Sequence, residues 1–304
     1  METEVLIGGF LAAAVRVATP LLIAAIGETI VQRAGVLNLG LEGMMLTGAL
    51  AAALGATAAG PWTGVLLAIL AGVLLAAVFA LIVVAARADQ VIAGTAITLG
   101  AVGLTGTVYR QAYGSAGAGL DLPTLPSLAI PVLSEIPALG AAFFAQPAPT
   151  YLIAVLVPLV WWAMFRTRAG LSLRATGEAA AIARAAGVPT ARVRIVATLI
   201  GGGFAGLAGA TLVLAQVGTF AEKMTAGRGY VAIAMVVLGR WHPVGVAIAA
   251  FVFGAAMAVQ FLFQALGLEV PYQLFLMLPY LLALLALAGI VGRVRAPGDL
   301  AKAS

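Results

Sequence analysis

Long runs of apolar residues without a charge dominate the chain and predict a bundle of membrane-spanning helices. A helix crosses the hydrocarbon core of a bilayer with about 20 mostly apolar residues. Residues 43–86 are long enough for two such helices, and Gly60-Pro61 supplies the turn between them. The other runs lie at 5–26, 90–109, 136–165, 195–221, 241–268 and 270–292. Only the run at 5–26 contains a charged residue, which is Arg16. The pattern therefore predicts an all-α, polytopic membrane protein with eight long spans.

Two segments do not fit the pattern of long spans. Residues 229–239 are apolar but too short to cross upright alone, so we expect a half-helix or a span that flanking polar residues complete. The expected number of transmembrane helices is accordingly eight to nine. Residues 111–148 contain five prolines and many small polar residues. This composition favours an irregular loop outside the hydrocarbon, which can include a short surface helix.

The composition narrows the class of protein. Hydrophobic residues make up 63% of the 304 residues and charged residues 9%, against about 25% charged residues in ordinary soluble domains. This balance excludes a cytosolic enzyme, a disordered chain and a nucleic-acid-binding protein. The chain has no cysteine and one histidine, which argues against disulfides, a thiolate metal site and a histidine-based catalytic triad. We therefore expect helices surrounded by the lipid bilayer, with no metal and no cofactor.

The basic residues indicate how the chain threads through the membrane. Residues 166–194 carry six arginines (166, 168, 174, 184, 192 and 194) and one acid, Glu178. The positive-inside rule places this segment in the cytoplasm. The loop at 111–148 and the N-terminus then lie outside, and the tail at 293–304 lies in the cytoplasm. Twelve arginine and lysine residues fall on the inner side and three on the outer side, which supports this threading.

The densest set of polar residues at membrane depth lies between residues 27 and 43. Glu28 and Gln32 are four positions apart and share a helix face, and Glu28 can also pair with Arg33 near the cytoplasmic interface. Three glycines then interrupt the helix and indicate a bend or a short re-entrant segment. Two interpretations are open, a polar knot that pins an irregular turn and a gate beside the transport pathway. The pathway or gate candidates are Glu28, Gln32, Asn38, Glu42, Gln90 and Thr95.

Two further patterns concern packing and chemistry. Gln90 and Thr95 open the fourth span, either as an interfacial cap or as part of a pore lining. Glycines at 201–203, 206 and 209 form a small-residue stripe, which is typical of membrane helices that pack closely. The chain contains no Gly-x-x-x-x-Gly-Lys-Ser/Thr motif, so we do not expect it to hydrolyse ATP or to act as an enzyme.

The arginine-rich segment contains a predicted surface helix. Residues Glu178–Ala186 are nine positions rich in alanine, which is the strongest helix former. Thr176 or Gly177 can cap the start of this helix, and Gly187 suits its C-cap with Pro189 beyond it. A short helix rich in alanine loses little side-chain entropy when it docks into a groove on a partner. A simpler interpretation is that this segment only sets the membrane topology. That interpretation explains the arginines but not the capped helix.

Three blocks of the sequence resemble a known family. Residues 178–187 look like the cytoplasmic coupling loop of ABC importer permeases, whose pattern is Glu-Ala-Ala followed by a glycine. Residues 27–45 resemble the branched-chain amino acid/ribose/nucleoside permease family, and are most similar to the smaller permease subunit of bacterial nucleoside importers. Residues 229–245 look like a third block, and the likeness extends from about residue 20 to residue 292. The Glu-Ala-Ala element departs from the fuller family form, because alanine stands where Asn-Pro often follows the glutamate.

The resemblance implies an ATP-driven importer that works by alternating access. Residues 1–304 would form one transmembrane permease domain in a bacterial plasma membrane, with nucleosides as the leading solute. Two ATPase subunits, a second permease (a copy or a paralogue) and an extracytoplasmic solute-binding protein would be its partners. Glu28, Asn38 and Glu42 match the N-terminal block, for which the resemblance assigns no role. The residues that would couple the permease to the ATPase are Glu178, Ala179, Ala180, Arg184 and Gly187.

Other functions remain open from the sequence. Simple sugars and branched-chain amino acids are alternative solutes. An ion-coupled secondary carrier would need an ion site near the middle of the membrane and usually an internal repeat, of which residues 42–45 and 222–224 give only a weak echo. An intramembrane enzyme would need converging acid, base or metal-binding groups, and the sequence supplies no such set.

Overall fold

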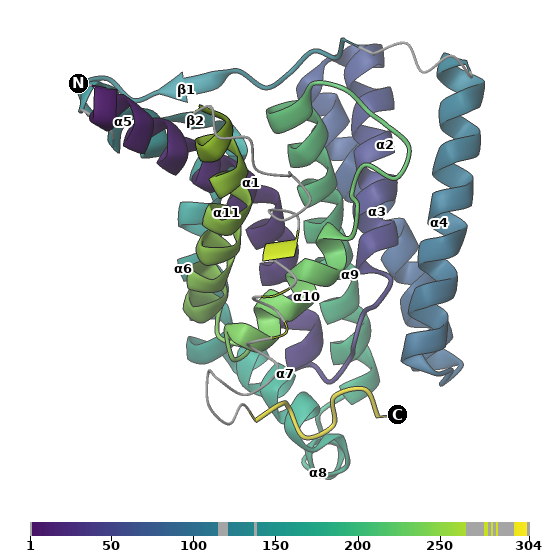
Figure 1. The fold of residues 1–304 in the computed structure, drawn as a ribbon. Helices are drawn as coiled ribbons and strands as arrows, with labels where there is room; N and C mark the ends of the chain where they lie inside the picture. The colour runs from purple at the N-terminus through teal and green to yellow at the C-terminus, as the bar shows by residue number, and fades with distance from the viewer. Residues whose placement is uncertain are drawn as a thin grey trace.

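The computed structural model describes residues 2–114, 121–136, 139–265 and 295–302, together with positions 277–278, 281 and 284. Helices make up nearly all of this part of the chain (Figure 1). Elements η1 and η3 are π-helical turns that continue α3 and α9, and η2 is a short 3-10 helix. In chain order the elements are α1 (Glu2–Arg33), α2 (Leu41–Ala59), α3 (Pro61–Ala80), η1 (Leu81–Ala85), α4 (Gln90–Tyr113), β1 (Ser127–Ala129), η2 (Leu133–Glu135), α5 (Leu139–Phe143), β2 (Ala145–Pro147), α6 (Ala148–Arg166), α7 (Arg168–Glu178), α8 (Ala180–Ala185), α9 (Thr190–Thr211), η3 (Leu212–Val217), α10 (Arg228–Leu238) and α11 (Pro243–Ala265).

Six helices in the described part of the chain are long and apolar enough to cross a membrane. They are α1, α2, α3 with η1, α4, α6, and α9 with η3. Helix α10 has 11 residues and is about 16 Å long, or about half the thickness of the hydrocarbon core. The sequence left open whether 229–239 is a half-helix, and the structure shows that it is one. The predicted span at 270–292 lies outside the described residues, apart from four single positions, so the total of eight to nine stays a prediction.

Two predictions overlap at residues 136–148, and the described residues agree with the irregular loop at 111–148 and not with the start of the span at 136–165. Its first part contains α5 and strand β2, and helix α6 begins only at Ala148. Strand β2 pairs antiparallel with β1, with Leu128 opposite Gln146, so a small hairpin departs from the predicted all-α fold. Tyr151 fixes the hairpin to α6, because its hydroxyl donates to the Leu128 carbonyl (2.8 Å) and accepts from the Gln146 amide (3.1 Å). Pro149 fits in the first turn of α6, because the N–H groups of that turn have no partner within the helix.

Close contacts between glycines join α2, α3 and α9 into one layer. A Cβ atom at Gly72 would collide with the Gly202 carbonyl, and one at Gly48 would lie 2.6 Å from the Gly206 Cα. A Cβ at Gly209 would collide with the Met45 carbonyl. The stripe predicted from the sequence is therefore confirmed as a close-packing surface, which we call the glycine seam. Backbones that approach this closely gain van der Waals contact that larger side chains would prevent.

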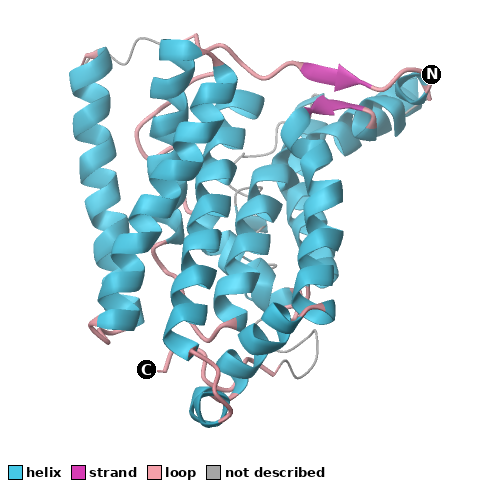
Figure 2. Cartoon of the chain, turned by 180° about the vertical axis from the view of Figure 1, so that it is seen from behind, coloured by secondary structure: helices cyan, strands magenta, loops and turns pink. Residues whose placement is uncertain are grey.

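The remaining helices flank this layer. Helices α1, α6 and α11 stand on one side of it, and α4 stands at the opposite edge of the bundle (Figure 1). The N-terminus lies at the end of the molecule that carries β1, β2 and α5, and the C-terminus lies at the opposite end with α7 and α8, as the view from behind also shows (Figure 2). The predicted threading requires this relative arrangement of the two termini and the two loops.

Candidate transport and coupling sites

The end of α1 carries a buried polar cluster. Gln32 donates from Nε2 to Glu28 Oε1 (2.9 Å), which confirms the predicted shared helix face. The same carboxylate oxygen accepts from the Asn38 amide (3.2 Å), and Trp241 Nε1 donates to Gln32 Oε1 (2.7 Å). Glu28, Gln32 and Asn38 are fully buried, and Glu28 Oε2 and Asn38 Oδ1 have no hydrogen-bond partner among the described residues. The cluster thus joins α1, the segment after it and the end of α10.

The predicted pair between Glu28 and Arg33 is wrong. Arg33 Nη1 lies 3.8 Å from a carboxylate oxygen of Glu178, and Arg33 Nε donates to the Trp241 carbonyl (2.9 Å). Five residues turn an α-helix by about 140° beyond one full turn, so Glu28 and Arg33 point in different directions. Arg33 therefore connects the end of α1 to Glu178 at the end of α7. Trp241, which is 3% exposed and bonds within the cluster, was not among the residues predicted for the site.

A glycine turn ends α1. Gly35 has a φ of +86°, its amide donates to the Gln32 carbonyl (2.9 Å), and the Val36 amide donates to the Val31 carbonyl (3.2 Å). This is a Schellman motif, which closes a helix with a left-handed residue. Arg194 Nε donates to the Ala34 carbonyl (3.3 Å), where the helix end carries partial negative charge. The sequence placed Arg194 in the cytoplasmic loop, whereas it is a buried residue of α9.

Residues 34–40, which follow α1, run alongside α4. This agrees with the bend or re-entrant segment that the glycines predicted. Gln90 Oε1 at the start of α4 accepts from the Leu37 amide (2.7 Å), and Thr98 Oγ1 donates to the Leu39 carbonyl (3.2 Å). Gln90 and Thr98 are eight residues apart, a rise of about 12 Å in a helix. Thr95 stands apart from this contact, since it is exposed and bonds to the Val91 and Ile92 carbonyls of its own helix. Residues 34–40, which we call the rising segment, thus bring α2 to begin inside the bundle.

The half-helix α10 begins at the carboxylate of Glu42. Glu42 Oε1 accepts from the Gly227 amide (2.8 Å) and Oε2 accepts from the Gly229 amide (2.7 Å). The residue is 7% exposed, so these bonds are shielded from water and strong. A carboxylate at this place also complements the partial positive charge of the helix N-terminus. A Cβ at Gly229 would lie 2.7 Å from the Glu42 Cα, which explains why a glycine occupies this position.

The segment predicted as one surface helix, residues 178–186, is divided between two helices. Glu178 ends α7, the backbone breaks at Ala179 (φ −157°, ψ 84°), and α8 spans only Ala180–Ala185. The predicted start at Glu178 is therefore wrong. The predicted C-cap is confirmed, because Gly187 has a φ of +85° and donates to the Arg184 carbonyl (2.9 Å). Ile182, in the middle of α8, is 72% exposed.

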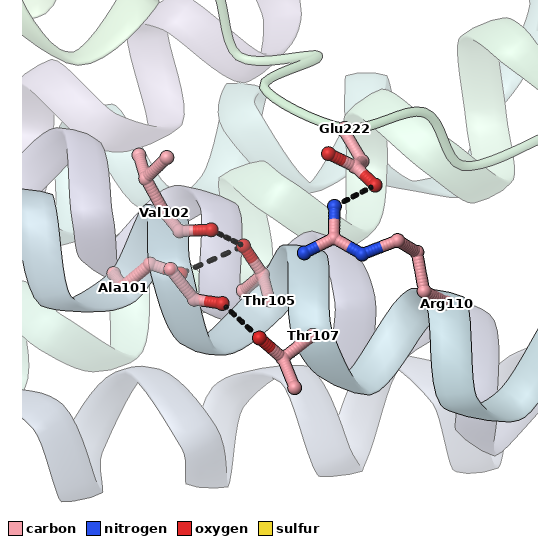
Figure 3. A network of polar contacts seen from close by, with 7 residues as sticks. Ala101, Val102, Thr105, Thr107, Arg110 and Glu222 are labelled. Carbon is pink, nitrogen blue, oxygen red and sulfur yellow. Dashed lines mark hydrogen bonds and ion pairs between the residues drawn. The ribbon is translucent and has the colours of Figure 1, made fainter. Parts of the chain in front are cut away.

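An ion pair joins the C-terminal part of α4 to the segment before α10. Arg110 Nη1 lies 2.8 Å from Glu222 Oε1 (Figure 3). The nearby Thr105 and Thr107 hydroxyls bond only to carbonyls of their own helix, as the same view shows. The ion pair is thus the polar link between the two elements in this view.

Breaking this ion pair is expected to change stability little. The two side chains are 52% and 38% exposed, and exposed pairs contribute about 0.2–1 kcal/mol. A double-mutant cycle with Arg110→Ala and Glu222→Ala, followed by thermal unfolding in detergent, is therefore expected to give a coupling energy below about 1 kcal/mol. A coupling energy several times larger would mean that the pair is shielded from solvent in the detergent-solubilised protein.

Apolar helices of membrane length, a half-helix inside the bundle and buried polar residues beside it define a multi-pass membrane transport protein. The chain belongs to the family described as branched-chain amino acid transport system / permease component, whose model matches residues 10–287. The named relatives below are permease proteins of ABC transporters, in agreement with the resemblance seen in the sequence.

Three relatives cover most of the chain. The putative glucose ABC transporter permease protein TsgC13 of Haloferax volcanii is 41% identical over 86% of this chain and 79% of its own length. The guanosine ABC transporter permease protein NupQ of Bacillus subtilis is 34% identical, and the nucleoside ABC transporter permease protein NupC of Lactococcus lactis is 32% identical. Each of these two alignments covers 92% of this chain and 91% of the relative. No solved structure matches the chain significantly.

Proposed function

We propose that this chain forms the solute pathway of an ATP-driven importer for nucleosides. The observation that carries the proposal is the alignment of a guanosine permease and a nucleoside permease with 92% of the chain, in a family of transport permeases. The pathway or gate candidates are Glu28, Gln32, Asn38, Glu42, Gln90 and Thr95. Transport follows alternating access, in which the helices reorient around a central path.

The capped half-helix supports a solute without negative charge. Half-helix N-termini in transporters bind anionic groups of substrates, such as a carboxylate. Here the Glu42 carboxylate already occupies the N-terminus of α10 and bonds to the Gly227 and Gly229 amides. A carboxylate or phosphate of a solute would be repelled at this place. Nucleosides and simple sugars are neutral, whereas branched-chain amino acids carry a carboxylate, so this geometry favours the first two.

A simple sugar is the second candidate solute. The relative that is 41% identical is a putative glucose permease, although its alignment covers less of the chain than those of the two nucleoside permeases. Sugars and nucleosides share neutral hydroxylated rings, which neutral amide and hydroxyl groups can recognise by hydrogen bonds.

The coupling helix supplies the contact with the ATPase in this proposal. Two ATPase subunits dock on α8 of this chain and of a second permease, and an extracytoplasmic binding protein delivers the solute at the opposite end. The end with α7 and α8 then faces the cytoplasm, together with the C-terminus, and the N-terminus faces outward. The exposed Ile182 side chain and the capped C-terminus of α8 support this role. They give α8 an ordered backbone and an apolar side chain that is free to contact a partner. ATP hydrolysis resides in the partner chain.

The test is purification of the tagged chain from its native membrane in mild detergent, followed by reconstitution of the recovered complex in liposomes. Co-purification of an ATPase and ATP-dependent uptake of guanosine, not reduced by excess glucose or leucine, are expected. Uptake of glucose in place of guanosine would establish the sugar candidate. Recovery of the chain without any ATPase, with uptake that follows an ion gradient, would replace the proposal with a secondary carrier.

Replacing Gly187 with alanine is expected to uncouple transport from ATP hydrolysis. No atom lies within 4 Å of the added Cβ, so only the left-handed backbone at φ +85° is disfavoured. This costs about 1–2 kcal/mol for an L-residue and disturbs the turn that ends α8. Uptake should fall several-fold while ATPase activity and membrane insertion persist, and Glu178→Ala should act in the same direction.

Gly100→Ala is the matched control for this variant. Its Cβ also has no atom within 4 Å, but Gly100 lies in the helical backbone of α4. Measured in the same liposomes, it should transport as the unmodified protein does. Normal uptake by the Gly187 and Glu178 variants would show that the coupling assignment is wrong.

A further inference from the structure

The C-terminal segment lies across the junction between α7 and α8, about 120 residues away in sequence. The Asp299 amide donates to the Gly177 carbonyl (2.8 Å), and the Ala180 amide donates to Asp299 Oδ2 (2.6 Å). The Gly298 amide donates to Glu178 Oε2 (3.3 Å). A Cβ at Gly298 would lie 2.5 Å from the Glu178 carbonyl oxygen, so the two backbones are in close contact. These bonds attach the tail to the short region where the helix direction changes.

Helix α8 has no N-cap of its own. The residue at its N-cap position is Ala179, whose side chain cannot accept a hydrogen bond. The Asp299 carboxylate takes over this function for the first amide of the helix. The hydrogen bond from the Ala180 amide lowers the pKa of Asp299 below its usual value, and Lys302 adds to the effect. The group is therefore a carboxylate at neutral pH, which is the form that interacts favourably with a helix N-terminus.

The other end of the same segment contacts the rising segment. The Lys302 carbonyl accepts from Gln90 Nε2 (3.2 Å), and Gln90 Oε1 accepts from the Leu37 amide (2.7 Å). Gln90 is 5% exposed, so both bonds are largely shielded from water. Leu300 packs against the main hydrophobic core between these two contacts. The tail is thus attached at three points, to the α7–α8 junction, to the core and, through Gln90, to residue 37.

We propose that residues 295–302 form a strap that fixes the orientation of α8 and connects it to the rising segment, with Asp299 as a positioning residue. The proposal rests on the coupling role of α8 given above. A displacement of α8 by the ATPase pulls on Asp299 and, through Lys302 and Gln90, on residue 37. The rising segment leads directly into α2, whose Glu42 holds the start of α10. The strap therefore links the coupling helix to the half-helix inside the bundle.

The first test separates the carboxylate contact from general effects on the tail. In the reconstituted complex, Asp299→Ala is expected to move about fivefold fewer solute molecules per ATP hydrolysed, since the cap of α8 is lost. Asp299→Asn retains an oxygen that accepts from the Ala180 amide, so it should restore most of the coupling. Arg295→Ala changes an exposed side chain of the same segment and is the control.

The second test asks whether the two ends of the strap act together. Gln90→Glu keeps an acceptor for the Leu37 amide but replaces the group that donates to the Lys302 carbonyl. If the strap transmits movement, Asp299→Ala and Gln90→Glu each break the same link, and the double variant should be no worse than either single variant. Effects on coupling that simply add would overturn the link between the two ends.

Hydrogen exchange at the Ala180 amide makes the result independent of transport. This amide should exchange faster in Asp299→Ala than in the unmodified protein or in Asp299→Asn. Equal exchange in all three would overturn the capping by Asp299 whatever the transport assay shows. Absence of ATP-driven uptake in the unmodified complex would instead refute the proposed function. Normal coupling in Asp299→Ala, with ATP-driven uptake in the unmodified complex, would refute the strap alone.

Discussion

Gly206→Ala is expected to destabilise the helix bundle more than any other single methyl group added along α9. The new Cβ would collide with the Ala68 carbonyl of α3 and lie 3.1 Å from the Ile69 Cα. These atoms belong to the backbone, so a change of side-chain rotamer cannot relieve the clash. Overpacking of this kind typically costs about 1–3 kcal/mol, and we expect the upper end. Thermal unfolding of the purified protein in detergent, followed by size-exclusion chromatography, measures the effect.

Gly203→Ala provides the control for the glycine seam. Gly203 lies on the same helix, three residues before Gly206, but a Cβ there would lie 3.4 Å from Val73 Cγ2 and 3.7 Å from Ile69 Cγ2. These are ordinary contacts, and alanine also has a higher helix propensity than glycine. The melting temperature of this variant should stay the same or rise slightly. Equal losses of stability in both variants would mean that α9 is sensitive to any added methyl group and that the seam is not special.

Removing the Glu42 carboxylate is expected to abolish transport. Glu42→Ala leaves the Gly227 and Gly229 amides without their acceptor in a buried place. Each hydrogen bond to a charged group contributes about 1.5–3 kcal/mol. The start of α10 therefore loses the two hydrogen bonds that fix it to α2. Glu42→Gln keeps one acceptor oxygen and should have an intermediate effect. Solute uptake and hydrogen exchange at the two glycine amides are the measurements.

Glu135→Ala is the matched control. It separates the loss of the Glu42 contacts with α10 from the loss of a negative charge alone. Glu135→Ala removes the same group from the short helix η2, where the side chain is exposed. Its uptake and its exchange rates at Gly227 and Gly229 should equal those of the unmodified protein. Transport at the normal rate in Glu42→Ala would show that the half-helix keeps its place without the carboxylate.

The helices could be predicted more completely than the loops, for a physical reason. Lipid forces a chain without charges to satisfy its backbone internally, so runs such as 43–86 and 195–221 locate helices well. The run at 136–165 misled because apolarity does not distinguish a spanning helix from a hairpin and a short helix outside it. Pro137, Pro147 and Pro149 near its start are the signal that α6 begins late, since a helix tolerates proline best in its first turn, whereas Pro158 lies inside α6.

The site could be predicted only where partners lie on one helix. Four-residue spacing on α1 predicted the contact between Glu28 and Gln32, and the glycine stripe predicted close packing of α9 without its partners. The partners of Glu42 lie 185 and 187 positions along the chain, and no periodicity connects such positions. For Asp299 the sequence predicts only a place in a cytoplasmic tail. Its contact with Ala180 could not be predicted, because that contact depends on how the chain folds back.

The glycine seam has a consequence for biosynthesis. Gly72 and Gly202 lie 130 positions apart, and ribosomes add about 5–20 residues per second, so about 7–26 s pass between the synthesis of the two halves. During this interval the hairpin of α2 and α3 sits in the bilayer with its glycine surface facing lipid. A nascent chain that stops before α9 would present this surface to other helices, so the layer of α2, α3 and α9 forms only when α9 arrives.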